Sequence, residues 1–346
     1  MLRFDHVKVK KTMIDVLEEL GLNKDSIRHM TDSIVETSLR GVDSHGINLF
    51  PHYVNVIRSG RISKSPKFNV EIKTLTTAVL DADGALGHHA GVVAMEKAIL
   101  CAKKNGMGAV AVKNSSHFGA AAHFGLMAAH EGCLGFSFTN ADALVKATNA
   151  KESFFGTNPV CFAAPMAGED PFCLDMATST ISWNKRNNYL RENRKLEGGW
   201  AFDKDGFETI NPSDAVSLSP TGDYKGFGLG MMVDILVSVL AGSFISKDIK
   251  PMYGLDIKER RNIGHFFMAI SIDGFSELDG FKERLKDMVD RVRSMEKTSS
   301  NDVLVPGDPE KKTKVIRLKS NIPVDEVKYQ EFLNISKDFE KCLSYE

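Results

Sequence analysis

The sequence lacks the features that mark secreted, membrane-spanning or nucleic-acid-binding proteins. Its five cysteines are scattered and never paired as Cys-x-x-Cys, which indicates buried thiols in a reducing compartment. The 44 basic and 45 acidic residues balance, and no Lys/Arg block suggests a nucleic-acid or membrane-surface partner. These absences favour a cytoplasmic protein whose partner is a small molecule.

Neither a signal peptide nor a transmembrane helix is predicted. Charged residues interrupt the first eight positions, where a signal peptide needs an apolar core. The most apolar segment, residues 226–242, is shorter than the roughly 20 residues that span a bilayer, and Asp234 interrupts it. We therefore interpret this segment as a buried helix.

Nucleotide-binding loops of the familiar kinds are missing as well. Residues 106–111 match Gly-x-Gly-x-x-Ala, but a predicted helix precedes them and a predicted strand follows, which reverses the Rossmann arrangement. Gly106 is better explained as a helix C-cap, and no Walker motif occurs. A nucleotide would have to bind to another scaffold.

The patterns that are present indicate a mixed α/β chain. Residues 1–60 have helical spacing of apolar side chains, and from about residue 68 short β-like runs alternate with Ala-rich helices. Helical patterns return near the end of the chain. We expect the two ends to pack together as a helical subdomain (residues 1–72 with 295–346) beside an α/β domain for cofactor and substrate (residues 73–294). The β-like runs span residues 68–72, 78–81, 108–112, 134–139, 160–164, 172–176 and 265–272.

A histidine follows one of these β-like runs. His117 lies between small residues just after the run at 108–112, and Gly119 comes two positions later. A strand fixes the direction of the residues at its end, and histidine titrates near neutral pH, so His117 is a candidate catalytic base. An ordinary histidine in a surface loop fits the local pattern equally well.

A second polar cluster, residues 40–46, ends the second predicted helix. Asp43 and His45 could hold a metal, His45 could transfer a proton, or Asp43 and Ser44 could simply form turn hydrogen bonds. The spacing of the other histidines does not match a helical zinc pair. We therefore predict no metal site.

Two further segments could contact an anion. Asp175 and Thr178 could cap a helix that begins near Ser179 and expose its amides to a phosphate. Lys225 opens the apolar segment, and a lysine at a helix N-terminus is unfavourable unless it meets an anion. Simple capping and a lysine that extends into solvent are the alternatives.

Six motifs occur in order along the chain, namely Ser44-His-Gly46, Ser116-His-Phe-Gly119, Gly156-Thr-Asn-Pro159, Asp175-Met-Ala-Thr178, Lys225-Gly226 and Pro306-Gly307. Together they resemble the malate/L-lactate dehydrogenase family, which lacks the Rossmann fold. The resemblance covers about residues 10–330, and the segments Met252-Tyr253 and Arg261-Asn-Ile-Gly264 look especially similar to ureidoglycolate dehydrogenase. It implies an α/β (α+β) fold with a non-Rossmann, largely antiparallel mixed sheet and flanking helices, NAD or NADP as the cofactor, and a homodimer.

The resemblance also implies roles for individual residues. His117 is similar to the catalytic proton-transfer residue, and His45 to a second active-site histidine. The substrate-binding positions it implies are Ser44, Tyr53, Lys146 and Arg261. The cofactor-binding positions it implies are Asn140, Asn158, Asp175, Met176, Ala177, Thr178, Lys225, Gly226, Pro306, Gly307 and Asp308.

Three positions depart from the family pattern. Leu49 replaces an arginine four residues after the first active-site histidine, which is a contact for the substrate carboxylate. Tyr224 replaces a histidine, and residues 146–149 replace a Pro-x-Gly-Gly segment. Lys146 or Arg261 could supply the missing charge, and the identity of the acid is left open.

The sequence thus predicts an NAD(P)-dependent oxidoreductase that transfers a hydride between the nicotinamide and a 2-hydroxy acid or its 2-oxo form. The acid would be of the malate, lactate, ureidoglycolate or sulfolactate type. One alternative is a non-catalytic relative that serves as a binding or assembly module, which Leu49 favours. The other is a metal-dependent hydrolase or lyase built on Asp43, His45 and His117.

Overall fold

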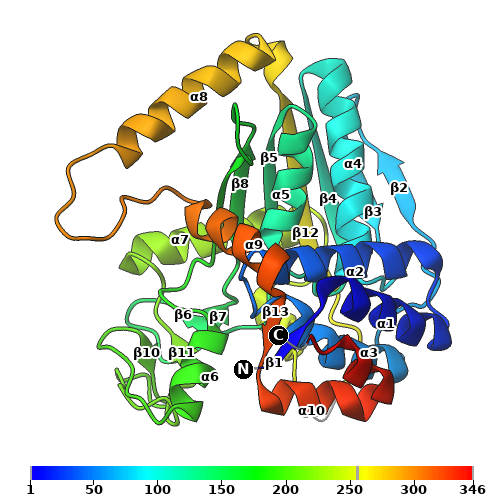
Figure 1. Ribbon diagram of the computed structural model, residues 1–346, viewed down its shortest axis with the longest axis vertical. Helices are drawn as coiled ribbons and strands as arrows, with labels where there is room; N and C mark the ends of the chain where they lie inside the picture. The colour runs from blue at the N-terminus through cyan, green and yellow to red at the C-terminus, as the bar shows by residue number, and fades with distance from the viewer. Residues whose placement is uncertain (1, 255–256, 345–346) are drawn as a thin grey trace.

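The computed structural model describes residues 2–254 and 257–344, and its main element is a seven-stranded sheet (Figure 1). The strand order is β2-β3-β4-β12-β5-β8-β9, in which only β3 and β4 are parallel neighbours. The predicted largely antiparallel, non-Rossmann sheet is therefore confirmed. The strands are β2 (Asn69–Ile72), β3 (Thr77–Asp81), β4 (Met107–Ser115), β5 (Cys133–Thr139), β8 (Val160–Ala164), β9 (Phe172–Met176) and β12 (Ile263–Ser271).

Two Ala-rich helices, α4 (Gly87–Asn105) and α5 (Ala121–His130), cover one face of this sheet (Figure 1). Small residues allow the close approach, since a Cβ added to Gly135 in β5 would collide with the backbone of Gly125 in α5. Phe118, Phe124 and Phe267 pack between the layers. As predicted, Gly106 ends α4 with a positive φ.

Both ends of the chain contribute to one helical layer. Helices α1 (His6–Glu19), α2 (Lys24–Leu39) and α3 (Phe50–Arg58) share a core with α10 (Glu326–Ile335) and the 3₁₀ segment Lys337–Cys342. Strand β1 (Leu2–Phe4) pairs with β13 (Ile322–Val324), which directly follows α9 (Asp308–Ser320). The ends pack together as expected, whereas the domain limits at residues 72 and 295 stay a prediction.

A smaller sheet lies apart from the large one, beside α6 (Trp183–Arg191) (Figure 1). Its order is β10 (Ala201–Phe202), β11 (Ser217–Leu218), β6 (Val145–Lys146) and β7 (Ser153–Phe155). Helix α8 (Leu278–Arg293) crosses the far end of the molecule. Within residues 2–254 and 257–344, no helix is both long and apolar enough to cross a membrane.

The apolar segment at residues 226–242 departs from the prediction of a buried helix. Helix α7 (Asp223–Asp234) continues into a π-helical turn, Ile235–Val239. One side is buried through Val233 and Val237, but Ile235 and Val239 are 48% and 69% exposed. The helix is apolar all round, and this chain alone covers only part of its surface.

Candidate active site

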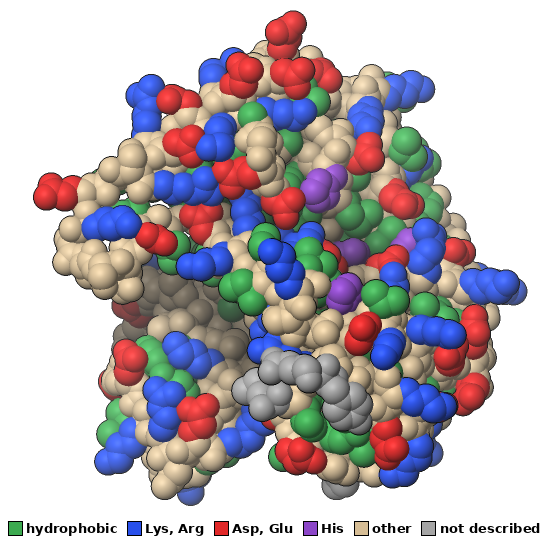
Figure 2. All heavy atoms as spheres, viewed as in Figure 1, with side chains coloured by type: hydrophobic (Ala, Val, Ile, Leu, Met, Phe, Trp, Pro, Cys, Tyr) green, Lys and Arg blue, Asp and Glu red, His purple; other side chains and the backbone are tan. Residues whose placement is uncertain are grey.

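A cavity of about 830 Å³ lies where the end of α2, the ends of β4 and β9, and the loop before α9 meet. Figure 2 shows a deep recess between the lobe that carries α6 and the connection from α8 to α9. Residues 183–184 and 304–307, from the two sides of this recess, line the cavity. The wall contains nine of the predicted site residues, which are Ser44, His45, His117, Asp175, Met176, Ala177, Arg261, Pro306 and Gly307.

The turn after β4 fixes the position of His117. The Ser116 hydroxyl donates to the carbonyl of Ala85 (2.9 Å) and accepts from the amide of Gly87 (3.0 Å). Phe118 is buried on the other side of the turn. At Gly119, φ is +79°, and a Cβ there would lie 2.7 Å from Nε2 of His88, so only glycine fits. The histidine is therefore held rigidly.

Tyr53 lies behind His117 rather than on the cavity wall. Its hydroxyl is 2.7 Å from Nδ1 of His117, and the amide of Gly119 donates to the same nitrogen at 3.4 Å. These contacts leave the second ring nitrogen, Nε2, for the cavity. Burial lowers the pKa of His117 well below its usual 6.5, so the resting imidazole is neutral.

His45 lies beside His117 in the cavity wall. The two rings are stacked with centroids 5.7 Å apart, and Ser44 Oγ is 2.8 Å from Nδ1 of His45. Burial lowers the pKa of His45 to about 4, so this ring is neutral as well. Two neutral imidazoles side by side can contact the same oxygen of a bound molecule.

Asp43 does not take part in the pair of histidines. Its carboxylate accepts from Arg317 of α9 (Nη2 to Oδ2, 2.8 Å). Across the described parts of the chain, no group of three or more His, Cys, Asp or Glu side chains is arranged to hold a metal ion. Asp43 therefore fastens α9 to the end of α2, and Ser44 is the partner that orients His45.

Asp175 brings a carboxylate to the cavity wall at the end of β9. Its Oδ2 accepts from the amide of Ala122 in the first turn of α5 (2.7 Å). Burial raises the pKa of Asp175 to about 6, although this hydrogen bond opposes the shift. The expectation that Asp175 and Thr178 cap the next helix is wrong, because α6 begins at Trp183 with Ser182 as its cap.

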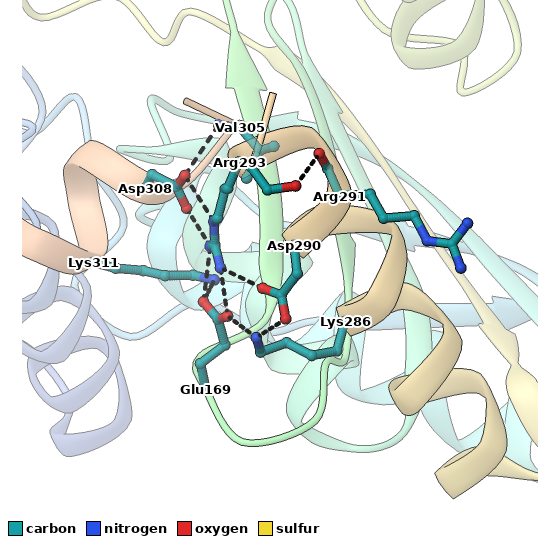
Figure 3. A network of polar contacts seen from close by, with 9 residues as sticks. Glu169, Lys286, Asp290, Arg291, Arg293, Val305, Asp308 and Lys311 are labelled. Atoms are coloured by element: carbon teal, nitrogen blue, oxygen red, sulfur yellow. Dashed lines mark hydrogen bonds and ion pairs between the residues drawn. The ribbon is translucent and has the colours of Figure 1, made fainter. Parts of the chain in front are cut away.

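Ion pairs stabilise the loop that brings Pro306 and Gly307 to the cavity (Figure 3). Asp308 accepts from the amide of Val305 (3.1 Å) and pairs with Arg293 of α8 (2.6 Å). Glu169, in the turn between β8 and β9, binds both Arg293 (2.7 Å) and Lys311 of α9 (2.8 Å). The Asp308 carboxylate therefore belongs to this ion network, and the cavity wall holds Pro306 and Gly307.

Comparison with known protein families identifies the family to which this chain belongs. A family model described as malate/L-lactate dehydrogenase matches residues 4–333. The chain belongs to the malate/L-lactate dehydrogenase family. The resemblance predicted from its six motifs is confirmed.

Relatives within the family are similar over almost the whole chain. A malate dehydrogenase of Pyrococcus abyssi is 36% identical over 90% of this chain and 88% of its own length. An L-sulfolactate dehydrogenase of Methanocaldococcus jannaschii is 32% identical, with 95% of each chain covered. Among solved structures, malate dehydrogenase from Entamoeba histolytica superposes with a TM-score of 0.92 at 31% identity, covering 98% of this chain and 99% of that one.

Several positions implied by the family lie off the cavity wall. The buried amide of Asn140 donates to Asp234 Oδ1 (2.8 Å), and Asn158 donates to the carbonyl of Gly230 (2.9 Å), so both brace α7. Thr178 donates to the carbonyl of Thr157 at 3.1 Å. Gly226 is buried beneath the first turn of α7, where a Cβ would collide with the backbone of Thr221.

The two lysines implied by the family also lie outside the cavity. Lys146 lines a separate hollow of about 690 Å³, where its ammonium group donates to the carbonyl of Ala150 (2.7 Å) and lies 4.0 Å from the centre of the Phe202 ring. Lys225 is exposed on the first turn of α7. Their substrate and cofactor roles stay predictions.

Two charged residues of the wall had no role assigned from the sequence. Asp142 forms an ion pair with Arg261, which is 3% exposed and also donates from Nε to the carbonyl of Lys250 (2.8 Å). Arg40 is buried on the wall near His45. Its position in the polar cluster at residues 40–46 was the one sequence feature that could have indicated a role in the site. An arginine at the end of a helix, however, usually extends into solvent.

Proposed function

We propose that this protein is an NAD(P)-dependent oxidoreductase that transfers a hydride between the nicotinamide and the second carbon of a 2-hydroxy or 2-oxo acid. The observation that carries the proposal is the stacked pair of neutral, half-buried histidines in a cavity of ligand size, next to the family's cofactor segment. Relatives in this family are named as NAD(+)- and as NADP(+)-dependent dehydrogenases.

The cavity has features that fit a dinucleotide. Asp175 offers Oδ1, which has no hydrogen bond among the described residues, and a carboxylate on the cavity wall suits the hydroxyl groups of a ribose. Gly307 has a φ of +97° and lies so close to β9 that a Cβ would be 3.3 Å from the amide nitrogen of Cys173. When bound, the nicotinamide ring supplies or accepts the hydride.

His117 is the group that would move the proton. In the oxidation direction its Nε2 takes the proton from the hydroxyl group, and in the reduction direction the imidazolium returns that proton to the forming hydroxyl. Tyr53 is not the proton source, because its hydroxyl contacts Nδ1 of His117 behind the ring and Tyr53 does not line the cavity. His45 would hold the same oxygen or the neighbouring carboxylate, with Ser44 fixing its ring.

The test is a panel of 2-oxo acids with NADH and NADPH in parallel, run on the wild type and on His117→Asn. We expect turnover by the wild type with at least one pair and a loss of about 100- to 10,000-fold in the variant, since a positioned general acid or base contributes that much. Calorimetry should give nearly equal dinucleotide affinities for both proteins.

Equal turnover by the variant would remove His117 from the mechanism. A wild type that oxidises neither cofactor with any acid would contradict the proposed activity and favour the binding-module alternative.

The proposal includes a homodimer in a reducing compartment such as the cytoplasm. Along α7 and its π-helical turn, one row of apolar side chains is exposed, and a contiguous patch of this kind marks an interaction surface. All five cysteines are free, which supports a reducing environment. The apolar row consists of Leu229, Met231, Met232, Ile235, Val239 and Leu240.

A further inference from the structure

Arg40 places a buried guanidinium group at the cavity. It is the C-cap residue of α2, and its side chain is only 5% exposed. It lines the same wall as His45 and His117, with Asp175 and Glu310 also on the wall. Its neighbour Gly41 packs against Thr313 of α9, which holds this end of α2 in place.

Arg40 differs from the arginines around it in having no partner. Arg261 is paired with Asp142, and Arg317 is paired with Asp43. For the Arg40 guanidinium, no hydrogen bond or ion pair occurs among the residues that the structure describes. Asp175 is near enough to interact with its charge, but the two side chains are not in contact as an ion pair.

A buried and unpaired guanidinium is costly, because an arginine keeps its charge in proteins and cannot avoid the desolvation penalty by losing a proton. Proteins retain this unfavourable free energy at sites where the charge serves a function. The planar fork of an arginine matches a carboxylate or a phosphate, to which it donates two parallel hydrogen bonds. An oxyanion that arrives with a ligand would supply the partner that Arg40 lacks.

We propose that Arg40 binds an oxyanion of the bound ligand, either the carboxylate of the acid or a phosphate oxygen of the dinucleotide. The proposal rests on the proposed function, which supplies both ligands. It also accounts for Leu49, an apolar residue on the same wall at a position where the family has an arginine. Arg261 does not fill that role in the free protein, since Asp142 already neutralises it.

Three variants test Arg40 by calorimetric titration. Arg40→Met removes the charge at similar length, Arg40→Lys keeps the charge without the fork, and Arg58→Met is the matched control at an exposed arginine of α3. The probes are NADH, and then oxamate, an unreactive 2-oxo acid analogue, added to the NADH-saturated protein. We expect Arg40→Met to weaken one probe about 10- to 100-fold, the usual cost of losing a charge-assisted pair. The control should bind both probes like the wild type.

The probe whose affinity decreases identifies the source of the oxyanion. Weaker oxamate with unchanged NADH assigns Arg40 to the acid, and weaker NADH assigns it to the dinucleotide. Unchanged affinity for both probes overturns the proposal, even if the wild type turns over a 2-oxo acid and the proposed function holds. If the wild type binds the probes but shows no turnover, the proposed function fails and the titrations still report on Arg40.

Thermal unfolding separates binding from a structural role. Without ligand, Arg40→Met should melt at the same temperature as the wild type or higher, because it removes an unpaired buried charge. A large decrease would show a structural role and overturn the proposal. Should Arg40→Met fail to fold, Arg40→Lys decides, with about threefold to tenfold weaker binding of one probe expected from the loss of the fork. Unchanged binding of both probes by Arg40→Lys would then reject the assignment.

Discussion

The hydroxyl group of Tyr53 controls which nitrogen of His117 can act as a base. The Gly119 amide can only donate to Nδ1, which favours a neutral ring with its proton on Nε2. That tautomer offers no lone pair to the cavity. The Tyr53 hydroxyl can rotate and accept from Nδ1–H instead, which frees Nε2 to take a proton. Tyr53 is thus a positioning residue in this scheme.

Replacing Tyr53 with Phe should lower kcat for oxidation of the hydroxy acid about 5-fold while KM changes little. The loss follows because a missing hydrogen-bond partner of about 1 kcal/mol leaves His117 in the non-basic tautomer. Steady-state kinetics measures the effect, and ¹⁵N NMR of His117 should show less protonation of Nδ1.

Tyr189→Phe in α6 is the matched control, because its hydroxyl is remote from the cavity. Unchanged kcat and an unchanged His117 spectrum in Tyr53→Phe would reject the positioning role.

The sequence predicts the site role of a residue where that residue belongs to a local motif. It does not predict a role that depends on contacts between residues distant in sequence. His117 and His45 could be singled out because each lies among small and polar residues within a few positions. The contact between Tyr53 and His117 joins residues 64 positions apart, and no local pattern encodes it. The same is true of the buried state of Arg40, since its neighbour Gly41 packs against Thr313, which lies more than 270 positions later in α9.

At the scale of elements, the strands were predictable because each is an apolar run of the right length. The run at 160–164 coincides with β8, and that at 172–176 with β9. The sequence places the start of α6 too early, because Ser179 and Ser182 are both suitable N-cap residues. In the structure Ser179 forms an isolated β-bridge with Pro220, and Ser182 caps the helix. The π-helical turn after α7 has no signature in the spacing of apolar residues.

The ion network around Glu169 joins three elements that are distant in sequence, namely the β8–β9 turn, α8 and α9 (Figure 3). The hydrogen bond from Arg293 lowers the pKa of Glu169 from the usual 4.5 to about 2. A carboxylate with a depressed folded pKa stabilises the fold above its unfolded pKa, and this contribution is lost as the pH falls toward 2.

Glu169→Gln should therefore lower the free energy of unfolding by about 2 kcal/mol at pH 7. The shift from 4.5 to about 2 corresponds to about 3.5 kcal/mol at about 1.4 kcal/mol per pKa unit, and solvent screening of this partly exposed network reduces that value. The difference from the wild type should shrink as the pH falls from 4.5 toward 2, because the wild-type carboxylate then gains its proton. Denaturant titrations at several pH values measure it.

Asp279→Asn removes a carboxylate that is 91% exposed in its pair with Lys282, and it serves as the control with no expected change. A Glu169→Gln variant as stable as the wild type at pH 7 would show that the network does not hold the loop.

For the whole molecule, the exposed apolar row on α7 and its π-helical turn predicts self-association. Ile235→Glu would place a charge in the middle of this row, and burying that charge at an interface is unfavourable. We expect light scattering to give twice the chain mass of 38.1 kDa for the wild type and a single chain mass for the variant.

Leu100→Glu is the comparison, because Leu100 is a 65% exposed apolar residue on α4. A wild type that stays monomeric at micromolar concentration would contradict the dimer, and so would an Ile235→Glu protein that stays dimeric.

The shared core of the two chain ends sets the order of events during synthesis. Helices α1 to α3 bury their apolar faces against Ile322, Phe332 and Phe339, which the ribosome adds more than 260 residues after α3 is complete. Because synthesis adds about 5–20 residues per second, those apolar faces stay exposed for roughly 15–50 s before their partners are made. The wall that carries His45 is completed by the loop before α9, so the nascent chain gains its binding cavity only after residues 304–310 have been made.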